Sequence, residues 1–231
     1  MLLDLPFPHK VVPSHRKTVA IHIRAREVEL RVPHGVDRHW LQNFAAEKTP
    51  WVLQTLQKQL HSARQQRILR SGLQIEVRGT PYEIVLNPAS KNQVLALGNQ
   101  LHIFSKQDEG EAYLKLLDQW LKKQAALYMP QKTLEYIERL QPKRVLSEIR
   151  YRKTRSKWGH CDSTGVIQYN WLIMLAPPAV IDYLIAHEVS HLEHMNHSAA
   201  FWNCVASLCP DYSRQRQWLK QNGLSLSLVV D

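Results

Sequence analysis

The chain of 231 residues is long enough for one large domain or two small ones, with a sizeable hydrophobic core that needs no disulfides. A hydrophobic content of 44% with 22% charged residues excludes disordered, collagen-like and coiled-coil proteins. Thirty Lys and Arg against 20 Asp and Glu give a formal net charge of +10, which suggests a polyanionic partner such as nucleic acid.

The cellular compartment is predicted from what the sequence lacks. No apolar run approaches the roughly 18 residues that cross a bilayer, and the first ten residues lack the basic start and long apolar stretch of a secretory signal. The three cysteines, Cys161, Cys204 and Cys209, form an odd count that is typical of reduced thiols rather than of a disulfide framework. We therefore expect a cytoplasmic protein with no membrane partner.

The first 105 residues are predicted to form a strand-rich part with one long helix. Residues 18–32 alternate apolar and polar side chains in two runs, which predicts a hairpin. Residues 37–70 carry apolar residues at helical spacing, and Pro50 is expected to break or kink this helix. Residues 73–104 contain four short strand-like runs separated by Gly, Pro and Asn, which predicts a meander.

Residues 106–231 are predicted to form a second part, in which helices accompany a small sheet. Two strands are expected, at residues 145–152 and 166–175. The expected helices cover residues 111–128, 133–140, 178–195, 198–208 and 212–221, and Pro130 divides the first two. Ser198 is the expected N-cap of its helix, and Phe201 and Trp202 are expected to anchor the loop before it. The fold class predicted for the whole chain is α+β.

The segment 187–191 reads HEVSH, which is the most informative motif in the sequence. On a helix, His187 and His191 lie one turn apart on the same face, so both imidazoles can reach one metal ion. Glu188 then projects beside them toward a metal-bound water. This is the arrangement of zinc peptidases, and it predicts one zinc ion per chain with Glu188 as the catalytic residue.

A catalytic zinc site requires a third protein ligand and an open position for water. His197 is the leading candidate, because its ten-residue separation from His187 occurs in the metzincin pattern H-E-x-x-H-x-x-G-x-x-H. His194 stands where that pattern has Gly, so this helix must end differently. Glu193 and His194 remain alternative ligands, although on a continuing helix both point away from the two motif histidines.

Three segments of the chain carry a resemblance to a known family. They read HEVSHLEHMNHSAAFW from residue 187, RSKWGHCDSTGVIQYNWLIMLAP from residue 155, and PDYSRQRQWL from residue 210. Together they resemble the YgjP-like metallopeptidase family, whose relatives are the WLM and SprT-type minimal zincins. The resemblance implies a zincin core, in which a mixed sheet accompanies the active-site helix.

The resemblance also implies roles for individual residues. Zinc would be held by His187, His191 and His197, with Glu188 as the general base. The family commonly shows the sequence W-G-S-C, whereas this chain has His160 in place of the serine. A role of that serine in the family therefore does not carry over to this chain.

The substrate is expected to bind along a strand. The zincin resemblance implies an edge strand before the metal-binding helix, to which an extended peptide adds as a further strand. We expect residues 165–175 to be this strand, with Gln168 and Tyr169 as substrate-binding residues; an interior strand is the alternative. By residue type, the candidate donors to the oxyanion are His160, Tyr169 and Tyr183.

Two functions are compatible with these features. The first is a zinc-dependent peptidase with protein or peptide substrates, which three histidines beside a glutamate favour over a structural site of four ligands. The alternative is a nucleic-acid-associated, SprT-like protein whose metal site supports the binding or processing of nucleoprotein substrates. Its candidate surface is the basic run of Arg150, Arg152, Lys153, Arg155 and Lys157, which otherwise serves only solubility.

Overall fold

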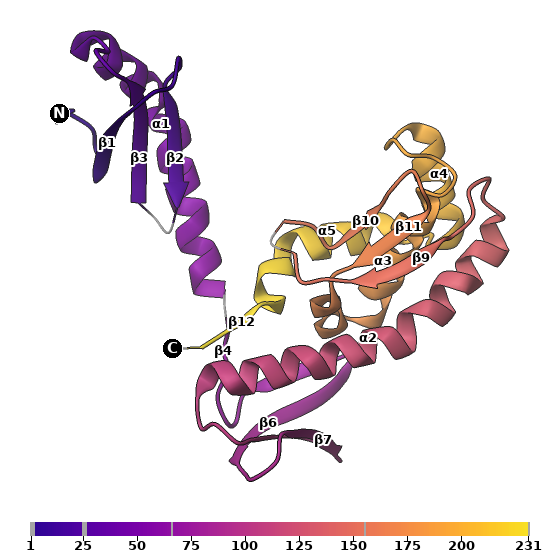
Figure 1. Cartoon of the computed structure of the whole chain (residues 1–231). Helices are drawn as coiled ribbons and strands as arrows, with labels where there is room; N and C mark the ends of the chain where they lie inside the picture. Colours follow the sequence, from indigo (N-terminus) through magenta and orange to yellow (C-terminus); the bar gives the residue numbers. More distant parts are fainter. Residues whose placement is uncertain (1–2, 25–26, 66, 155, 231) are drawn as a thin grey trace. The chain divides into compact units, whose positions relative to one another are not determined.

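The computed structural model describes residues 3–24, 27–65, 67–154 and 156–230, without the side chains of residues 58 and 61–65 (Figure 1). The chain consists of two compact units, residues 1–65 and 66–231, and each unit has its own hydrophobic core. Helices and small mixed sheets occur in the chain, so the predicted α+β class is confirmed. No helix within the described residues is both long and apolar enough to cross a membrane.

The first unit is a three-stranded sheet with one long helix. Its strands are β1 (His9–Ser14), β2 (Ala20–Arg24) and β3 (Glu27–Pro33), and its helix is α1 (Arg38–Gln65). β3 is the middle strand, parallel to β1 and antiparallel to β2. The predicted hairpin is therefore confirmed, although residues 25 and 26 at its turn lie outside the described residues. β1 is an additional strand that was not predicted.

Helix α1 continues through Pro50, so the expected break does not occur. A proline inside a helix removes one backbone hydrogen bond, and packing on both sides of it compensates. The buried residues that join this helix to β3 include Val28, Leu30, Val32, Leu41, Ala45 and Val52.

The second unit begins with a four-stranded sheet. Its strands are β5 (Gln74–Val77), β6 (Thr80–Pro88), β7 (Gln93–Leu97) and β8 (Gln100–Ser105), in the order β5-β6-β8-β7. The predicted meander is wrong, because β8 pairs in parallel with β6 and β7 lies at the edge. Burial explains this order: Leu101 and Ile103 of β8 are fully buried, whereas every residue of β7 is half-buried or exposed.

Helix α2 (Gly110–Leu140) packs on this sheet and on the C-terminal elements. It is a single helix, so the predicted division at Pro130 is wrong. One buried stripe runs along its whole length through Tyr113, Leu117, Leu121, Ala125, Met129, Thr133 and Tyr136. Because β8 and α2 share one core, the units divide the chain after residue 65, whereas the expected boundary lay after residue 105.

A second, three-stranded sheet lies close to the HEVSH segment. It contains β9 (Glu148–Tyr151), β10 (Gly159–Cys161) and β11 (Val166–Tyr169), in the order β10-β11-β9. β11 pairs with a neighbour on each side, so the prediction of an edge strand over 165–175 is wrong and the interior alternative holds. The expected strand also ends early, because residues Trp171–Leu175 form the 3-10 helix η1.

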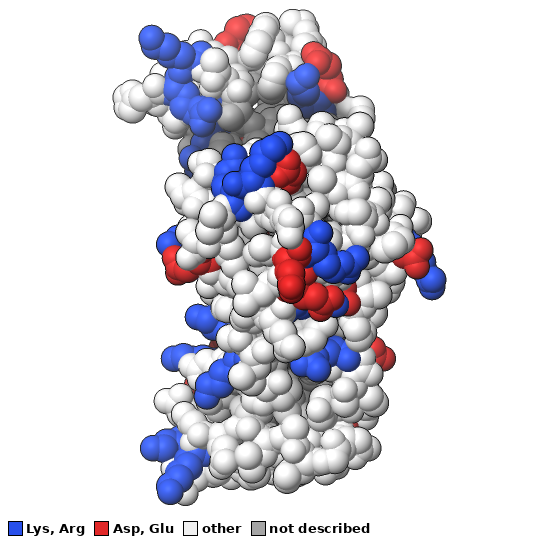
Figure 2. Space-filling view, turned by 90° about the vertical axis from the view of Figure 1, so that its right-hand side faces the viewer, with Lys and Arg blue, Asp and Glu red and all other residues white. Residues whose placement is uncertain are grey.

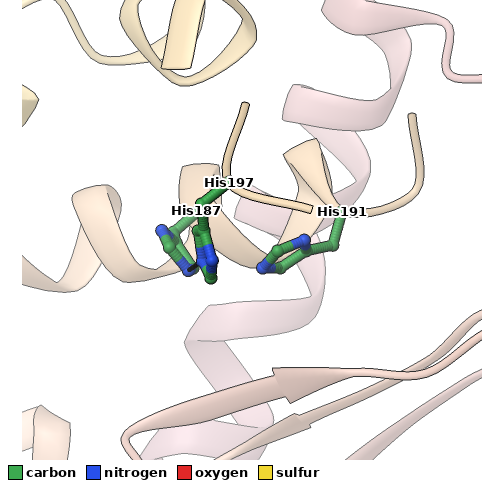
Figure 3. A group of neighbouring side chains, drawn as sticks. All are labelled: His187, His191 and His197. Atoms are coloured by element: carbon green, nitrogen blue, oxygen red, sulfur yellow. Dashed lines mark hydrogen bonds between the residues drawn. The ribbon is translucent and has the colours of Figure 1, made fainter. Parts of the chain in front are cut away.

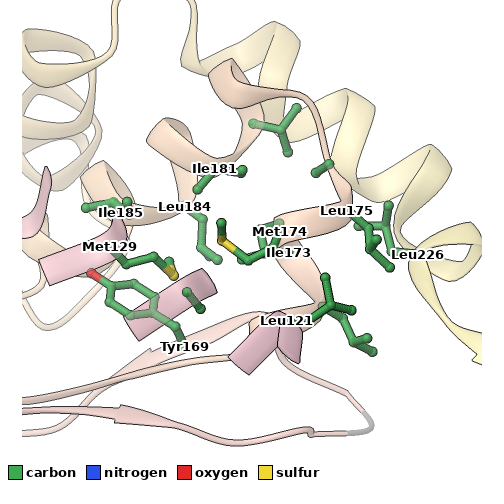
Figure 4. Packing of buried hydrophobic residues seen from close by; sticks show 14 of the residues in the cluster. Leu121, Met129, Tyr169, Ile173, Met174, Leu175, Ile181, Leu184, Ile185 and Leu226 are labelled. Carbon is green, nitrogen blue, oxygen red and sulfur yellow. The ribbon is translucent and has the colours of Figure 1, made fainter. Parts of the chain in front are cut away.

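The C-terminal helices are α3 (Pro178–Ser190), α4 (Ala199–Leu208) and α5 (Tyr212–Asn222), followed by the 3-10 helix η2 (Gly223–Leu226). The last strand, β12 (Leu228–Val229), pairs in parallel with β4 (Arg67–Ile68) at the start of the same unit. Figure 4 shows the core around α3, where side chains from α2, β11 and η1 pack together. α3 is buried on most sides, which suits a helix that carries reactive groups.

Candidate metal centre

Helix α3 holds the HEVSH segment in a fixed position. Pro178 occupies its first turn, and the helix packs against α2, α4, α5 and η1. The hydroxyl of Tyr128 on α2 donates a hydrogen bond of 3.0 Å to Asp182 Oδ1, which ties the two helices together. The helix ends at Ser190, earlier than expected, and the chain then turns back toward it.

Three imidazoles converge where the chain turns back (Figure 3). His187 and His191 come from the end of α3, and His197 comes from the loop before α4. Nε2 of His187 lies 3.2 Å from Nε2 of His197, and one nitrogen from each of the three rings lies within 4.8 Å of the others. Two nitrogens bound to one tetrahedral zinc lie about 3.4 Å apart, so this spacing fits a shared metal ion.

The protonation of the rings also fits a metal site. His191 Nδ1 lies 3.0 Å from the carbonyl oxygen of His194, so Nδ1–H donates there and Nε2 is left as the coordinating atom. Burial, together with the nearby His191 and His197, lowers the pKa of His187 to about 3, which keeps this ring neutral at pH 7. Neutral imidazole is the form that binds metal.

Residues Lys143 and Arg144 hold the turn that follows α3. The Arg144 backbone N–H and its Nη1 each donate to the carbonyl oxygen of Leu192, at 3.2 Å. The Lys143 backbone N–H donates to Glu193 Oε2 at 2.8 Å, and Lys143 Nζ lies 2.7 Å from Glu193 Oε1. Glu193 is therefore engaged away from the imidazoles, and neither it nor His194 belongs to the three-histidine group.

Aromatic side chains line the back of the centre. The buried ring of Phe201 lies 4.5–5.0 Å from all three imidazoles, and Trp202 stacks on His197 at 5.7 Å. Ser198 accepts a hydrogen bond from the backbone N–H of Phe201 and caps α4. The predicted cap and both predicted anchors are confirmed.

Glu188 follows His187 on α3, and its side chain packs against strand β10. A Cβ atom at Gly159 would lie 2.2 Å from Glu188 Oε1, so the carboxyl group packs directly on the backbone of this strand. Burial raises the pKa of Glu188 to about 8, against the positive charge of Lys157. Glu188 Oε2 is buried without a hydrogen-bond partner among the described residues, so no contact within them competes for this atom.

The proposed oxyanion donors differ in position. The hydroxyl of Tyr169 is fully buried and shares a hydrogen bond of 3.0 Å with Thr133, so it is engaged within the core. Tyr183 lies one turn before His187, with its ring 5.9 Å away. His160 is exposed on β10 and pairs with Gln168, which lies in the interior strand.

The basic run carries less free charge than its sequence suggests. Arg150 Nη2 lies 2.6 Å from Glu148, and Lys153 Nζ lies 2.8 Å from Asp118. Arg152 and Lys157 are exposed, and Arg155 lies outside the described residues. In Figure 2, acidic groups likewise lie among the Lys and Arg side chains of the face shown.

Comparison with known proteins supports a peptidase relationship. No curated protein matches this chain. The crystal structure of the metallopeptidase zymogen of Pyrococcus abyssi abylysin aligns with 44% of this chain and 99% of its own, at 17% identity and a TM-score of 0.38, which is too low to carry over a fold or an activity. The model of the YgjP-like metallopeptidase domain matches residues 17–222, which includes the whole metal centre. The chain therefore belongs to the YgjP-like metallopeptidase domain family.

Proposed function

We propose that this protein is a zinc-dependent peptidase that hydrolyses peptide bonds in protein or peptide substrates. The observation that carries the proposal is the convergence of His187, His191 and His197, two of which lie on the same helix turn as the buried Glu188. Three protein ligands leave one coordination position open, as catalytic zinc sites do. When bound, zinc supplies Lewis-acid polarisation of the peptide carbonyl and makes water more acidic.

Glu188 is the residue that moves protons in this proposal. Its Oε2 accepts the proton of the attacking water, and the same carboxyl group then donates it to the amine that leaves. A general base works best when its pKa is close to the working pH, and burial moves Glu188 in that direction. The hydrogen bond from His191 to the carbonyl of His194 keeps that ring oriented during the reaction.

We infer that the substrate runs along β10 rather than along β11. β10 is an edge strand, and Gly159 at its start contacts Glu188. The backbone N–H of Asp162 donates to Val166, and that of Asn170 donates to the carbonyl of Trp158. Because hydrogen-bonded pairs alternate in an antiparallel ladder, His160 faces β11 and the backbone groups of Gly159 and Cys161 face outward. These outward groups can pair with an extended peptide.

Metal content and peptide hydrolysis test the proposal in the purified protein. We expect one zinc ion per chain, and we expect Glu188→Gln to retain it while hydrolysis falls by about 10²–10⁴-fold, because an amide cannot accept the proton. Glu138→Gln is the matched control, since this exposed side chain lies on α2 and has no role in the centre. Equal hydrolysis by the wild-type protein and Glu188→Gln would contradict the proposed mechanism.

The ligand assignment is tested by a second pair of variants. His197→Ala should lower the zinc content sharply, because only two imidazoles remain. His194→Ala should retain zinc, because this residue holds His191 through its backbone carbonyl rather than through its side chain.

A further inference from the structure

An arginine with no acidic partner among the described residues lies at the border of the metal centre. Arg216 on α5 is exposed, and its guanidinium carbon lies 4.6 Å from the centre of the Trp202 ring. The same ring lies 5.8 Å from His187 and 5.7 Å from His197. None of the ion pairs within the described residues includes Arg216.

The surroundings of Arg216 leave its hydrogen-bond donors available. A guanidinium group that stacks on an aromatic ring keeps its N–H groups in its own plane, where they can form two parallel bonds to a carboxylate. Glu188 and Glu193 do not compete for it, since Glu188 is buried against Gly159 and Glu193 binds Lys143. Tyr212 stacks on Trp202 at 5.3 Å and extends the aromatic wall beside the cation.

We propose that Arg216 binds a carboxylate group of the substrate and so determines which peptides this site accepts. The inference rests on the proposed peptidase function. A peptide offers this group in two ways, as its C-terminal carboxylate or as an Asp or Glu side chain close to the bond that is cleaved. An Arg216 that binds the first favours removal of residues from the C-terminus, and one that binds the second favours cleavage next to acidic residues.

Two matched peptide pairs distinguish these sources. The first pair has one sequence with either a free C-terminal carboxylate or an amide, and the second has an amidated C-terminus with Glu or Gln at an internal position. We expect the zinc-loaded protein to cleave the carboxylate member of one pair with about tenfold higher kcat/KM at low salt, since a charge-assisted hydrogen bond contributes on this order. Arg216→Gln should remove this preference and retain the metal.

The control is Arg214→Gln, which removes the same charge from an exposed position on the same helix. It should retain the preference, whereas Arg216→Lys should retain only part of it, because an ammonium group lacks the planar pair of donors. A wild-type protein that cleaves both members of each pair equally, or a preference that persists in Arg216→Gln, would overturn the inference.

Binding measurements separate this inference from the proposed function. In a Glu188→Gln background, the dissociation constants of the same peptides report recognition without turnover. A carboxylate preference that depends on Arg216 in binding, with no hydrolysis by the wild-type protein, would contradict the peptidase function and support the inference. Hydrolysis without any such preference would support the function and contradict the inference.

Discussion

Gly159 is placed so that no larger residue fits beside Glu188. A Cβ atom at this position would lie 2.2 Å from Oε1 and 2.6 Å from the carboxyl carbon, well inside normal contact distances. The backbone of Gly159 is not in the left-handed region, so space rather than conformation requires the glycine. The residue thus determines where the carboxyl group of Glu188 lies relative to the three imidazoles.

We predict that Gly159→Ala retains zinc and loses about 10²-fold in kcat/KM, because the methyl group displaces the general base. Adding Glu188→Asp, whose shorter side chain vacates the overlapping volume, should recover part of that loss in the double variant. Steady-state kinetics and metal analysis of the four proteins in this cycle give the coupling between the two positions. Additive losses would mean that the two residues act independently.

The sequence contained enough information to predict the residues of the centre but not those that hold it in place. His187, Glu188 and His191 follow from helical periodicity, and the spacing to His197 follows from a known ligand pattern. Lys143 and Arg144 lie about 50 residues before the turn that they bind, and no local pattern connects such distant segments. Arg216 likewise gave no signal of its own within a balanced C-terminal region.

At the level of single elements, the sequence pattern predicted that a segment forms a strand but not which strands it pairs with. The β-branched and aromatic residues of β11 predicted a strand correctly, but interior and edge strands share this composition, so its neighbours could not be inferred. β10 has only three residues, one of them glycine, which is too short for a periodic signal. Pro130 suggested two helices, yet the buried stripe from Leu121 to Met129 and Thr133 continues past it and keeps α2 in one piece.

The alternation of backbone groups in β10 predicts a pattern in the substrate. N-methylation of a cleaved peptide at alternate positions should lower kcat/KM about fivefold each, because each methyl group removes one hydrogen bond worth about 1 kcal/mol. Methylation at the positions between them should have little effect, since those N–H groups face away from the strand. A uniform effect along the peptide, or none, would show that the substrate does not pair with β10.

At the scale of the whole molecule, the separate cores predict independent effects of core substitutions. Leu41 is fully buried in the first unit and Leu117 in the second. Leu41→Ala should destabilise residues 1–65 by about 2–5 kcal/mol without lowering zinc content, because every proposed ligand belongs to the other unit. Leu117→Ala should instead lower the unfolding temperature of the unit that binds zinc.

Differential scanning calorimetry with and without zinc checks this expectation. Added zinc should raise only the transition that Leu117→Ala lowers, since a ligand stabilises the unit that binds it. If Leu41→Ala shifts the zinc-dependent transition to the same extent, the two units unfold together.

The pairing of β12 with β4 brings residues 228–229 next to residues 67–68, so the second unit begins and ends at one place. A short linker could therefore join these two segments while new termini are opened elsewhere, as in circular permutation. The turn at Gly98 and Asn99 between β7 and β8 is exposed and belongs to the four-stranded sheet. The HEVSH helix instead contacts β10 of the three-stranded sheet. Residues 67–230 also have the geometry of an insertable module, whose adjacent ends could be grafted into a surface loop of another protein.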